Sequence, residues 1–536
     1  MLPTMRTWHL ASLVGAAIML ALSTALADQP TRADSGTDLA QVPKWSRADL
    51  DFFLHGSMST EVVPEGVLKA FVATYPDLFP NKDLSNFGLI PDPAFGWPIG
   101  ISRKNVPHLG GLPSIGINCA ACHVGQVDFG ADAKSVRLLG VTSHFDAEAF
   151  FGAVAVATFR TGDAKNMQRY LLNYLAASDP PIGGKAQESL ATAWKQQEEK
   201  ITAAMADDPA GSKHSGPGGL QEIGAANVRI DENTLEHDPD LAKVVRTQLK
   251  LFHNMRAALH IPDQPTPPSP PNGPGRNDPW RILSYSLLGI QTKPAPIKFG
   301  IVWNEHQRTW VHYDGNTRSP IIRNLAASLG LGAPLIGHDG VLDFASLKRH
   351  TALSEIILPP RYPLLIDRAT ADRGGKIYAN SCASCHDGPA TDQRLHSIAE
   401  TRTDPNRAEV FTPDIAERFN QFFAELRIPG YRPPEKPIRS TQKYWAPSLA
   451  GVWARSPYLH NGSVRTIREL LTAPADRAKS FHRGSRSYDP TEMGYADGGS
   501  YLLDTATPGN ANIGHNYGTD LSASERTELI EYLKTL

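Results

Sequence analysis

A pentapeptide of the form Cys-x-x-Cys-His occurs twice in this chain, at 119–123 and 382–386, and constrains the fold more than any other feature. The two copies use all four cysteines. In this pattern two thiols add to the vinyl groups of a porphyrin, and the histidine then binds the iron. We therefore expect two covalently bound haem c groups. The expected attachment residues and iron ligands are Cys119, Cys122, His123, Cys382, Cys385 and His386.

Two other uses of paired cysteines remain open at this point. A zinc site needs four ligands close in space, and a thioredoxin-like dithiol needs one pair beside a βαβ unit. Neither explains why both pairs are followed by a histidine and why no cysteine is left over. The pattern favours haem attachment.

The first 27 residues have the layout of a secretory signal peptide. Arg6 precedes an apolar run over 10–22, and the small residues Ala25-Leu26-Ala27 end the segment. An uncleaved membrane anchor is the alternative. No later stretch reaches membrane-spanning length. Because covalent haem attachment is completed outside the cytoplasm, we expect a periplasmic or secreted protein with no membrane span after cleavage.

The composition bears on the fold class and on the partners. Lys and Arg together number 53 and Asp and Glu 55, so the net charge of −2 gives no electrostatic footprint for nucleic acid. The 43 prolines and 44 glycines indicate much irregular chain around rigid cofactors. We expect a mainly α fold: two c-type cytochrome haem domains with long irregular loops and few short strands. The expected domains are 28–340 (N-terminal, with loop insertions) and 341–536 (C-terminal).

Helix-start signals place several helices along the chain. Asp146 is the expected N-cap of a helix to Phe159, and Thr412-Pro413 starts another. Capping boxes are expected at Thr466 with Glu469 and at Ser522 with Glu525. Further expected elements are a helix over 67–75, a hairpin over 126–139, helices over 188–205 and 238–259, and a helix over 369–380 that runs into the second pentapeptide.

Several motifs outside the pentapeptides together resemble one family. They are Phe53-x-His55-Gly56-Ser57, Asn118, Trp310-x-His312-x-Asp314-Gly315-Asn316-Thr317, Trp453-x-x-Ser456-Pro457-Tyr458-Leu459-His460-Asn461-Gly462-Ser463, Gly484-Ser485-Arg486-x-x-Asp489-Pro490 and Gly509-Asn510-x-Asn512-x-Gly514-His515. The set resembles the di-haem cytochrome c peroxidase-like proteins. Within them it is most similar to the branch of the secreted di-haem rubber oxygenase and the di-haem fatty-acid dioxygenases.

The resemblance implies different roles for the two haems. His515 corresponds to the second axial ligand of the C-terminal haem, opposite His386. The N-terminal haem keeps an open face for oxygen or peroxide, with His123 as its protein ligand. Trp280 corresponds to an aromatic near that open face. The chain departs from the family in being shorter than the rubber oxygenases and in having only Met493 after the second pentapeptide, outside a ligand motif.

Other readings of these residues stay open. His515 also fits an ordinary loop histidine. Trp310 and His312 are candidates for a distal pocket or an electron relay beside Trp280, although buried packing explains them equally well. Arg276 and Arg323 suit either haem propionates or structural ion pairs.

The sequence supports two hypotheses from different functional classes. The first is an exported haem oxidoreductase, peroxidase-like or dioxygenase-like, in which one haem activates peroxide or dioxygen and the other transfers electrons. Its further partner would be an apolar unsaturated substrate or a small redox-protein donor. The second is a non-catalytic di-haem electron-transfer protein with both irons six-coordinate.

Overall fold

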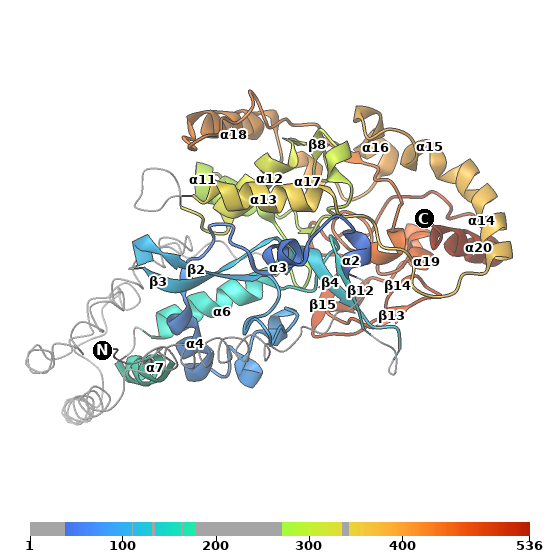
Figure 1. Cartoon of the computed structure of the whole chain (residues 1–536). Coiled ribbons are helices and arrows are strands. Elements are labelled where there is room, and N and C mark those ends of the chain that lie inside the picture. Colours follow the sequence, from blue (N-terminus) through green and yellow to red (C-terminus); the bar gives the residue numbers. More distant parts are fainter. Residues whose placement is uncertain (1–37, 110, 131–134, 162–163, 178–270, 335–341) are drawn as a thin grey trace, which may run out of the picture.

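The computed structural model describes residues 38–536 except 110, 131–134, 162–163, 178–270 and 335–341 (Figure 1). The expected signal peptide and the expected helices over 188–205 and 238–259 lie outside the described residues. The expected domain boundary at 340/341 falls in one of the omitted ranges, so the division into two domains stays a prediction.

Helices joined by long loops make up most of the described chain, and the strands are short, as expected for a mainly α protein (Figure 1). The α-helices are α2 (Asp38–Gln41), α3 (Arg47–His55), α4 (Glu65–Thr74), α5 (Cys119–His123), α6 (Ala147–Arg160), α7 (Ala164–Ala177), α11 (Pro279–Leu288), α12 (Pro320–Gly330), α13 (Phe344–Glu355), α14 (Arg368–Ser381), α15 (Ala383–His386), α16 (Ile398–Thr401), α17 (Asn406–Glu409), α18 (Pro413–Glu425), α19 (Ile467–Leu470) and α20 (Ala523–Leu533). The 3-10 turns are η1 (Pro80–Lys82), η2 (Ser85–Phe87), η3 (Pro107–Leu109), η4 (Glu305–Gln307), η5 (Asp392–Arg394), η6 (Val452–Arg455) and η7 (Pro474–Asp476).

The strands form one three-stranded sheet and a series of two-stranded ribbons, all antiparallel. The sheet has the order β1 (Val63–Pro64), β3 (Leu112–Ile117), β2 (Ile101–Val106), with Ile101 opposite Ile117. The ribbons pair β4 (Val124–Val127) with β5 (Val136–Leu139), β6 (Arg276–Asn277) with β7 (Ile297–Lys298), β8 (Trp310–Val311) with β9 (Thr317–Arg318), β10 (Leu395–Ser397) with β11 (Lys443–Trp445), β12 (Ser480–Arg483) with β15 (Tyr501–Asp504), and β13 (Tyr488–Asp489) with β14 (Gly494–Tyr495). The β4–β5 pair is the hairpin expected over 126–139.

Most of the expected helix starts are confirmed. Asp146 caps α6, Thr412 caps α18, and Ser522 with Glu525 forms a complete capping box on α20. At α19 only half of the expected box forms. Thr466 accepts from the Glu469 N–H, whereas the Glu469 carboxylate accepts from the backbone N–H of Arg465, one residue earlier than expected.

Three clusters of buried apolar side chains form the core. The first joins α4, α6 and α7 to the sheet of β1–β3, the blue and cyan part of Figure 1. The third joins α11, α12, α13 and α18 in the upper layer of that view. The second contains residues from both ends of the chain, such as Phe53, Leu139, Trp453 and Ile530. The segments that carry the two pentapeptides therefore share one core.

α14 and α20 pack side by side at the end of the molecule that carries the second pentapeptide (Figure 1). Their closest approach is at Gly374, where an added Cβ would lie 1.9 Å from the backbone oxygen of Glu528.

We expect Ser522→Ala to lower the free energy of unfolding by about 1 kcal/mol, because the first N–H groups of α20 lose their side-chain acceptor.

Urea unfolding of the two proteins checks this expectation. Ser500→Ala, at an exposed serine just before β15, is the matched control and should change the free energy of unfolding little. Equal effects of the two substitutions would contradict a stabilising role for the Ser522 cap.

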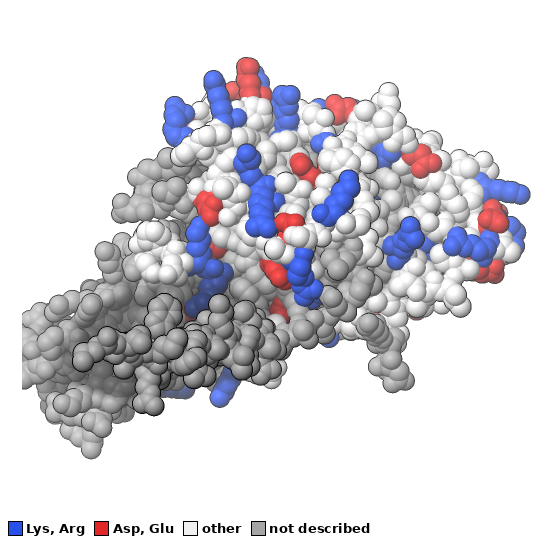
Figure 2. All heavy atoms as spheres, viewed as in Figure 1, with Lys and Arg blue, Asp and Glu red and all other residues white. Residues whose placement is uncertain are grey.

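On the face in Figure 2, basic and acidic side chains are interspersed rather than gathered by sign. Of the helices in the described part of the chain, none has the length and apolar character needed to cross a bilayer.

Candidate haem-binding site

The first pentapeptide forms the one-turn helix α5, and its N-terminus is fixed by Asn118. The Asn118 side chain accepts from the Ala120 N–H (2.9 Å) and donates to the backbone oxygen of Gly56 (2.9 Å). Asn118 thus both caps α5 and joins it to the end of α3. This is a structural reason for an asparagine at this position.

The second pentapeptide follows α14 and forms α15. Nδ1 of His386 lies 2.7 Å from the backbone oxygen of Pro447. A carbonyl can only accept, so Nδ1 donates and Nε2 is left with its lone pair. A hydrogen bond of this kind fixes both the ring orientation and the tautomer of a metal-binding histidine.

His515 is brought opposite His386. The two ring centres are 6.4 Å apart and the ring planes are inclined by 47°. Two nitrogen–metal bonds of about 2 Å, one to each ring, correspond to a separation of about 6 Å between ring centres. The space between these rings therefore fits an iron with two axial histidines.

The loop that carries His515 is held in place by two residues. Gly514 has φ +73°, and an added Cβ would lie 2.2 Å from the carbonyl carbon of Arg402, so glycine is required there. The buried Arg477 donates to the backbone oxygens of Leu470 (2.9 Å), Asn512 (2.6 Å) and Gly514 (2.8 Å). Arg477 is a residue that the sequence analysis missed, because its partners are main-chain groups with no motif of their own.

Both pentapeptides open into one cavity of about 470 Å³. Its lining includes Cys119, Cys122, His123, Cys382, Cys385, His386 and His515. Aliphatic and aromatic side chains such as Phe145, Leu283, Phe299 and Leu471 form much of the remaining wall. An apolar cavity with a few polar groups is what a buried cofactor needs.

The ionisation of the site residues suits haem and disfavours the alternatives. Burial raises the pKa of Cys119 and Cys122 to about 12 and that of Cys382 to about 11, the reverse of the lowered pKa of a reactive dithiol. The described residues contain no group of three or more His, Cys, Asp and Glu side chains placed to hold a metal ion. Burial lowers the pKa of His123 to about 3, so its imidazole is neutral, the form that binds a metal.

The surroundings of His123 differ from those of His386. The Gly300 backbone partly opposes the lowering of the His123 pKa, but Nδ1 of His123 is buried without a hydrogen-bond partner among the described residues. Among the residues that the structure describes, no second aromatic ring makes contact with His123, whereas His386 has His515 opposite. Sδ of Met58 lies 3.2 Å from Sγ of Cys119 on the cavity wall.

Two of the three distal or relay candidates line the cavity. Trp280 and His312 are in edge-to-face contact, with ring centres 5.7 Å apart, and Nδ1 of His312 is hydrogen-bonded to Oδ1 of Asn316 (2.9 Å). Trp310 is instead covered by the guanidinium of Arg439, 3.9 Å from the ring centre, and is not among the lining residues. Met493 is fully buried in the core and does not line the cavity.

A buried ion pair supports the Trp280 wall. Arg407 donates two hydrogen bonds to the carboxylate of Asp314 (2.8 and 3.1 Å), and the exposed fractions of these side chains are 1% and 2%. The Arg407 guanidinium lies 5.6 Å from the Trp280 ring centre. The polar-aromatic block at 310–317 is therefore held to α17 through Asp314.

The two arginines suggested for haem propionates have other partners. Arg276 donates to Asn510 with one Nη at 2.5 Å and does not line the cavity, although its Nε and other Nη are buried without a partner. Arg323 lines the cavity but forms an ion pair with Glu305. The sequence analysis missed three further cationic side chains of the cavity wall: Lys298, Arg308 and Arg455.

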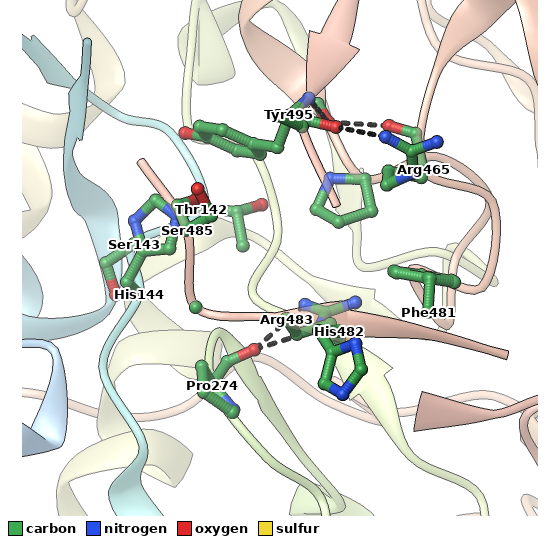
Figure 3. Close-up of a pocket in the computed structure, with 14 residues that line it drawn as sticks. Thr142, Ser143, His144, Pro274, Arg465, Phe481, His482, Arg483, Ser485 and Tyr495 are labelled. Carbon is green, nitrogen blue, oxygen red and sulfur yellow. Dashed lines mark hydrogen bonds between the residues drawn. The ribbon is translucent and has the colours of Figure 1, made fainter. Parts of the chain in front are cut away.

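A second, smaller pocket has no pentapeptide residue in its lining (Figure 3). Thr142, Ser143 and His144 face Arg483 and His482 across it, and Arg483 donates to the backbone oxygen of Pro274 (2.9 Å). Its volume of about 20 Å³ leaves space for a water molecule rather than for an organic ligand. We therefore place the functional site in the large cavity.

Comparison with known proteins agrees with this site. A family model described as RoxA-like, cytochrome c-like matches residues 443–482, which include Pro447 and Arg455. The match supports a haem cytochrome. A stretch covering 19% of the chain is 30% identical to 30% of a cytochrome-c peroxidase, IdrP1, of Denitromonas iodatirespirans.

Two relatives from Sinorhizobium fredii (strain NBRC 101917 / NGR234) match more of this haem cytochrome-like chain. The uncharacterized protein y4iJ is 25% identical over 96% of the chain and 95% of its own length. The uncharacterized protein y4iM is 32% identical over 44% of the chain and 63% of its own length. Together with the cytochrome and peroxidase similarities, the cavity supports a haem redox function.

Proposed function

We propose that the chain is an exported di-haem c-type cytochrome oxidoreductase. The haem held by His123 would activate peroxide or dioxygen, and the haem held by His386 and His515 would transfer electrons. The observation that carries the proposal is the contrast between the pentapeptides: a second imidazole lies 6.4 Å from the His386 ring, and none of the described rings contacts His123.

This contrast supports a different chemistry at each of the two positions. A haem with one axial histidine binds a small oxidant, whereas a haem with two passes electrons. The chain's own residues set that difference. The Pro447 carbonyl turns Nε2 of His386 away from the main chain, and Arg477 holds the His515 loop.

The wall on the His123 side suits a small oxidant next to an apolar partner. Trp280, Leu283 and Phe299 exclude water from this part of the cavity. Burial lowers the pKa of His312 to about 3, so its imidazole stays neutral and available as a hydrogen-bond partner. The organic partner would be an apolar unsaturated compound in a dioxygenase, or a small redox-protein donor near the second haem in a peroxidase.

Carbon monoxide binding to the reduced holoprotein tests the proposal, because this ligand binds only where an axial position is open. The expected result is a spectral shift confined to one haem, with about one carbon monoxide per chain. No shift at either haem would overturn the proposal in favour of a non-catalytic electron carrier. Oxygen consumption and peroxide turnover, with and without an unsaturated lipid, then separate dioxygenase from peroxidase.

A further inference from the structure

Two segments, 300–319 and 447–466, correspond at a constant spacing of 147 positions, with an arginine at 308 and 455, a glycine at 315 and 462 and an arginine at 318 and 465. The Pro447 backbone oxygen accepts from Nδ1 of His386, and Gly300, at the corresponding position, has a backbone group that raises the pKa of His123. Each segment ends at the N-cap of a helix, α12 after Ser319 and α19 after Thr466.

The backbone repeats along with the sequence. His312 and Leu459 have φ values of +75° and +62°, and the glycines three residues later, Gly315 and Gly462, have φ values of +57° and +65°. Residues other than glycine seldom adopt positive φ. A matched pair at the same spacing therefore indicates that the two segments are structural equivalents, one for each pentapeptide.

Arg308 and Arg455 are equivalent members of this repeat, and both line the cavity. Each guanidinium lies over a tryptophan that belongs to the other segment or comes just before it. Arg308 is 4.7 Å from the ring centre of Trp445, just before 447–466, and Arg455 is 5.3 Å from that of Trp303, within 300–319. The two arginines thus cross between the halves of the site.

Both arginines have hydrogen-bond donors to spare. Arg308 makes one long bond to the backbone oxygen of His312 (3.3 Å), and Arg455 makes one to that of Ala450 (2.7 Å). The Nε of each is buried without a partner among the described residues. An unpaired buried N–H is costly, so a partner is expected at each.

The charge around the pair is also unbalanced. Burial lowers the pKa of both guanidinium groups to about 10, and Arg308 lowers that of Arg455 further. Lys298 is a third basic residue of the cavity wall, but burial lowers its pKa, and its Nζ already donates to the backbone oxygens of Arg455 and Pro457. The acid that acts on Arg308, Glu305, is already paired with Arg323. The two buried guanidinium groups, which stay charged at neutral pH, therefore call for anionic groups inside the cavity.

We propose that Arg308 and Arg455 form a pair of carboxylate-binding residues, each donating to a propionate of a porphyrin bound in the shared cavity. A guanidinium suits this task because its planar fork matches a carboxylate. Since the arginines cross between the halves, each one acts on the potential of both haems. This inference rests on the proposed function, in which two haems occupy the cavity.

The test measures the reduction potential of each haem in purified holoprotein of Arg308→Gln and Arg455→Gln. A nearby positive charge stabilises the reduced haem, so removing the charge of the arginine lowers the reduction potential of the haem. At the wild-type midpoint, the reduced-to-oxidised ratio of each haem is expected to fall about tenfold, the size of one lost charge-assisted hydrogen bond. Arg418→Gln, at an exposed arginine paired with Asp414, is the control and should leave both ratios unchanged.

Other readouts separate the ways in which the inference fails. Haem content is measured first: a wild-type chain without two haems overturns the proposed function. With two haems present, unchanged ratios in both Gln variants, or a change at one haem only, overturn the carboxylate pair. If the Gln variants do not fold, Arg308→Lys and Arg455→Lys keep the charge and lose the fork. If the propionate band in the redox-difference infrared spectra of these Lys variants is the same as in the wild-type protein, the proposed carboxylate pair is overturned.

Discussion

Replacing His515 with alanine is expected to double the carbon monoxide bound by the reduced holoprotein, from about one to about two molecules per chain. The reason is the position of the His515 ring, 6.4 Å from the His386 ring and on a loop fixed by Gly514 and Arg477. Without this imidazole the second haem of the proposed enzyme would lose one of its two histidine ligands and gain an open position. Titration of the reduced protein, followed by visible spectroscopy, measures the stoichiometry.

An exposed histidine provides the control for this substitution. His482→Ala removes a half-exposed imidazole from β12 and should leave the stoichiometry at about one. His515→Ala protein that still binds one carbon monoxide would show that His515 is not the second ligand. Two molecules bound by the wild-type protein would lead to the same conclusion.

Asp314→Asn is expected to lower the free energy of unfolding by about 3–5 kcal/mol. The substitution leaves the Arg407 guanidinium, whose exposed fraction is 1%, without its counter-charge and with its Nε already unpaired. Because Arg407 lies against Trp280, the loss should also loosen the wall of the cavity on that side. Urea unfolding of the holoprotein measures the change.

The matched control for the buried pair is an exposed one. Asp414→Asn breaks the ion pair of Asp414 with Arg418 on the surface of α18, where the side chains are 72% and 54% exposed. Its expected cost is about 0.5 kcal/mol or less, because water screens such pairs. A cost for Asp314→Asn as small as that of the control would contradict a stabilising role for the buried pair.

The parts of the structure that depend on local sequence were predictable. Asp146, Thr412 and Ser522 cap helices where the sequence predicts, because an N-cap needs only a side-chain oxygen and the N–H groups of the next turn. The mainly α fold follows from the same signals. Each pentapeptide predicts its own chemistry, since the pattern puts two cysteines for attachment and a histidine for the iron within five positions, and haem attachment at these residues stays a prediction.

The parts that depend on long-range contacts were not predictable from local patterns. Nothing near Arg477 indicates that it binds the loop before His515, because its acceptors are main-chain oxygens. Arg276 and Arg323 were plausible partners for propionates from their charge alone, yet the structure gives Arg323 to Glu305. Arg308 and Arg455 become recognisable only when the chain is compared with itself and the positive φ angles of His312 and Leu459 are seen to match.

The anchoring of the 512–515 loop by Arg477 bears on the speed of electron transfer. A redox centre exchanges electrons quickly when few atoms must shift as its charge changes, so a stiff ligand sphere lowers the reorganisation energy. With its loop fastened at Asn512 and Gly514, the second site of the proposed enzyme would keep one shape in both oxidation states. The tunnelling distance between the porphyrins, rather than any movement of the ligand, would then limit the rate.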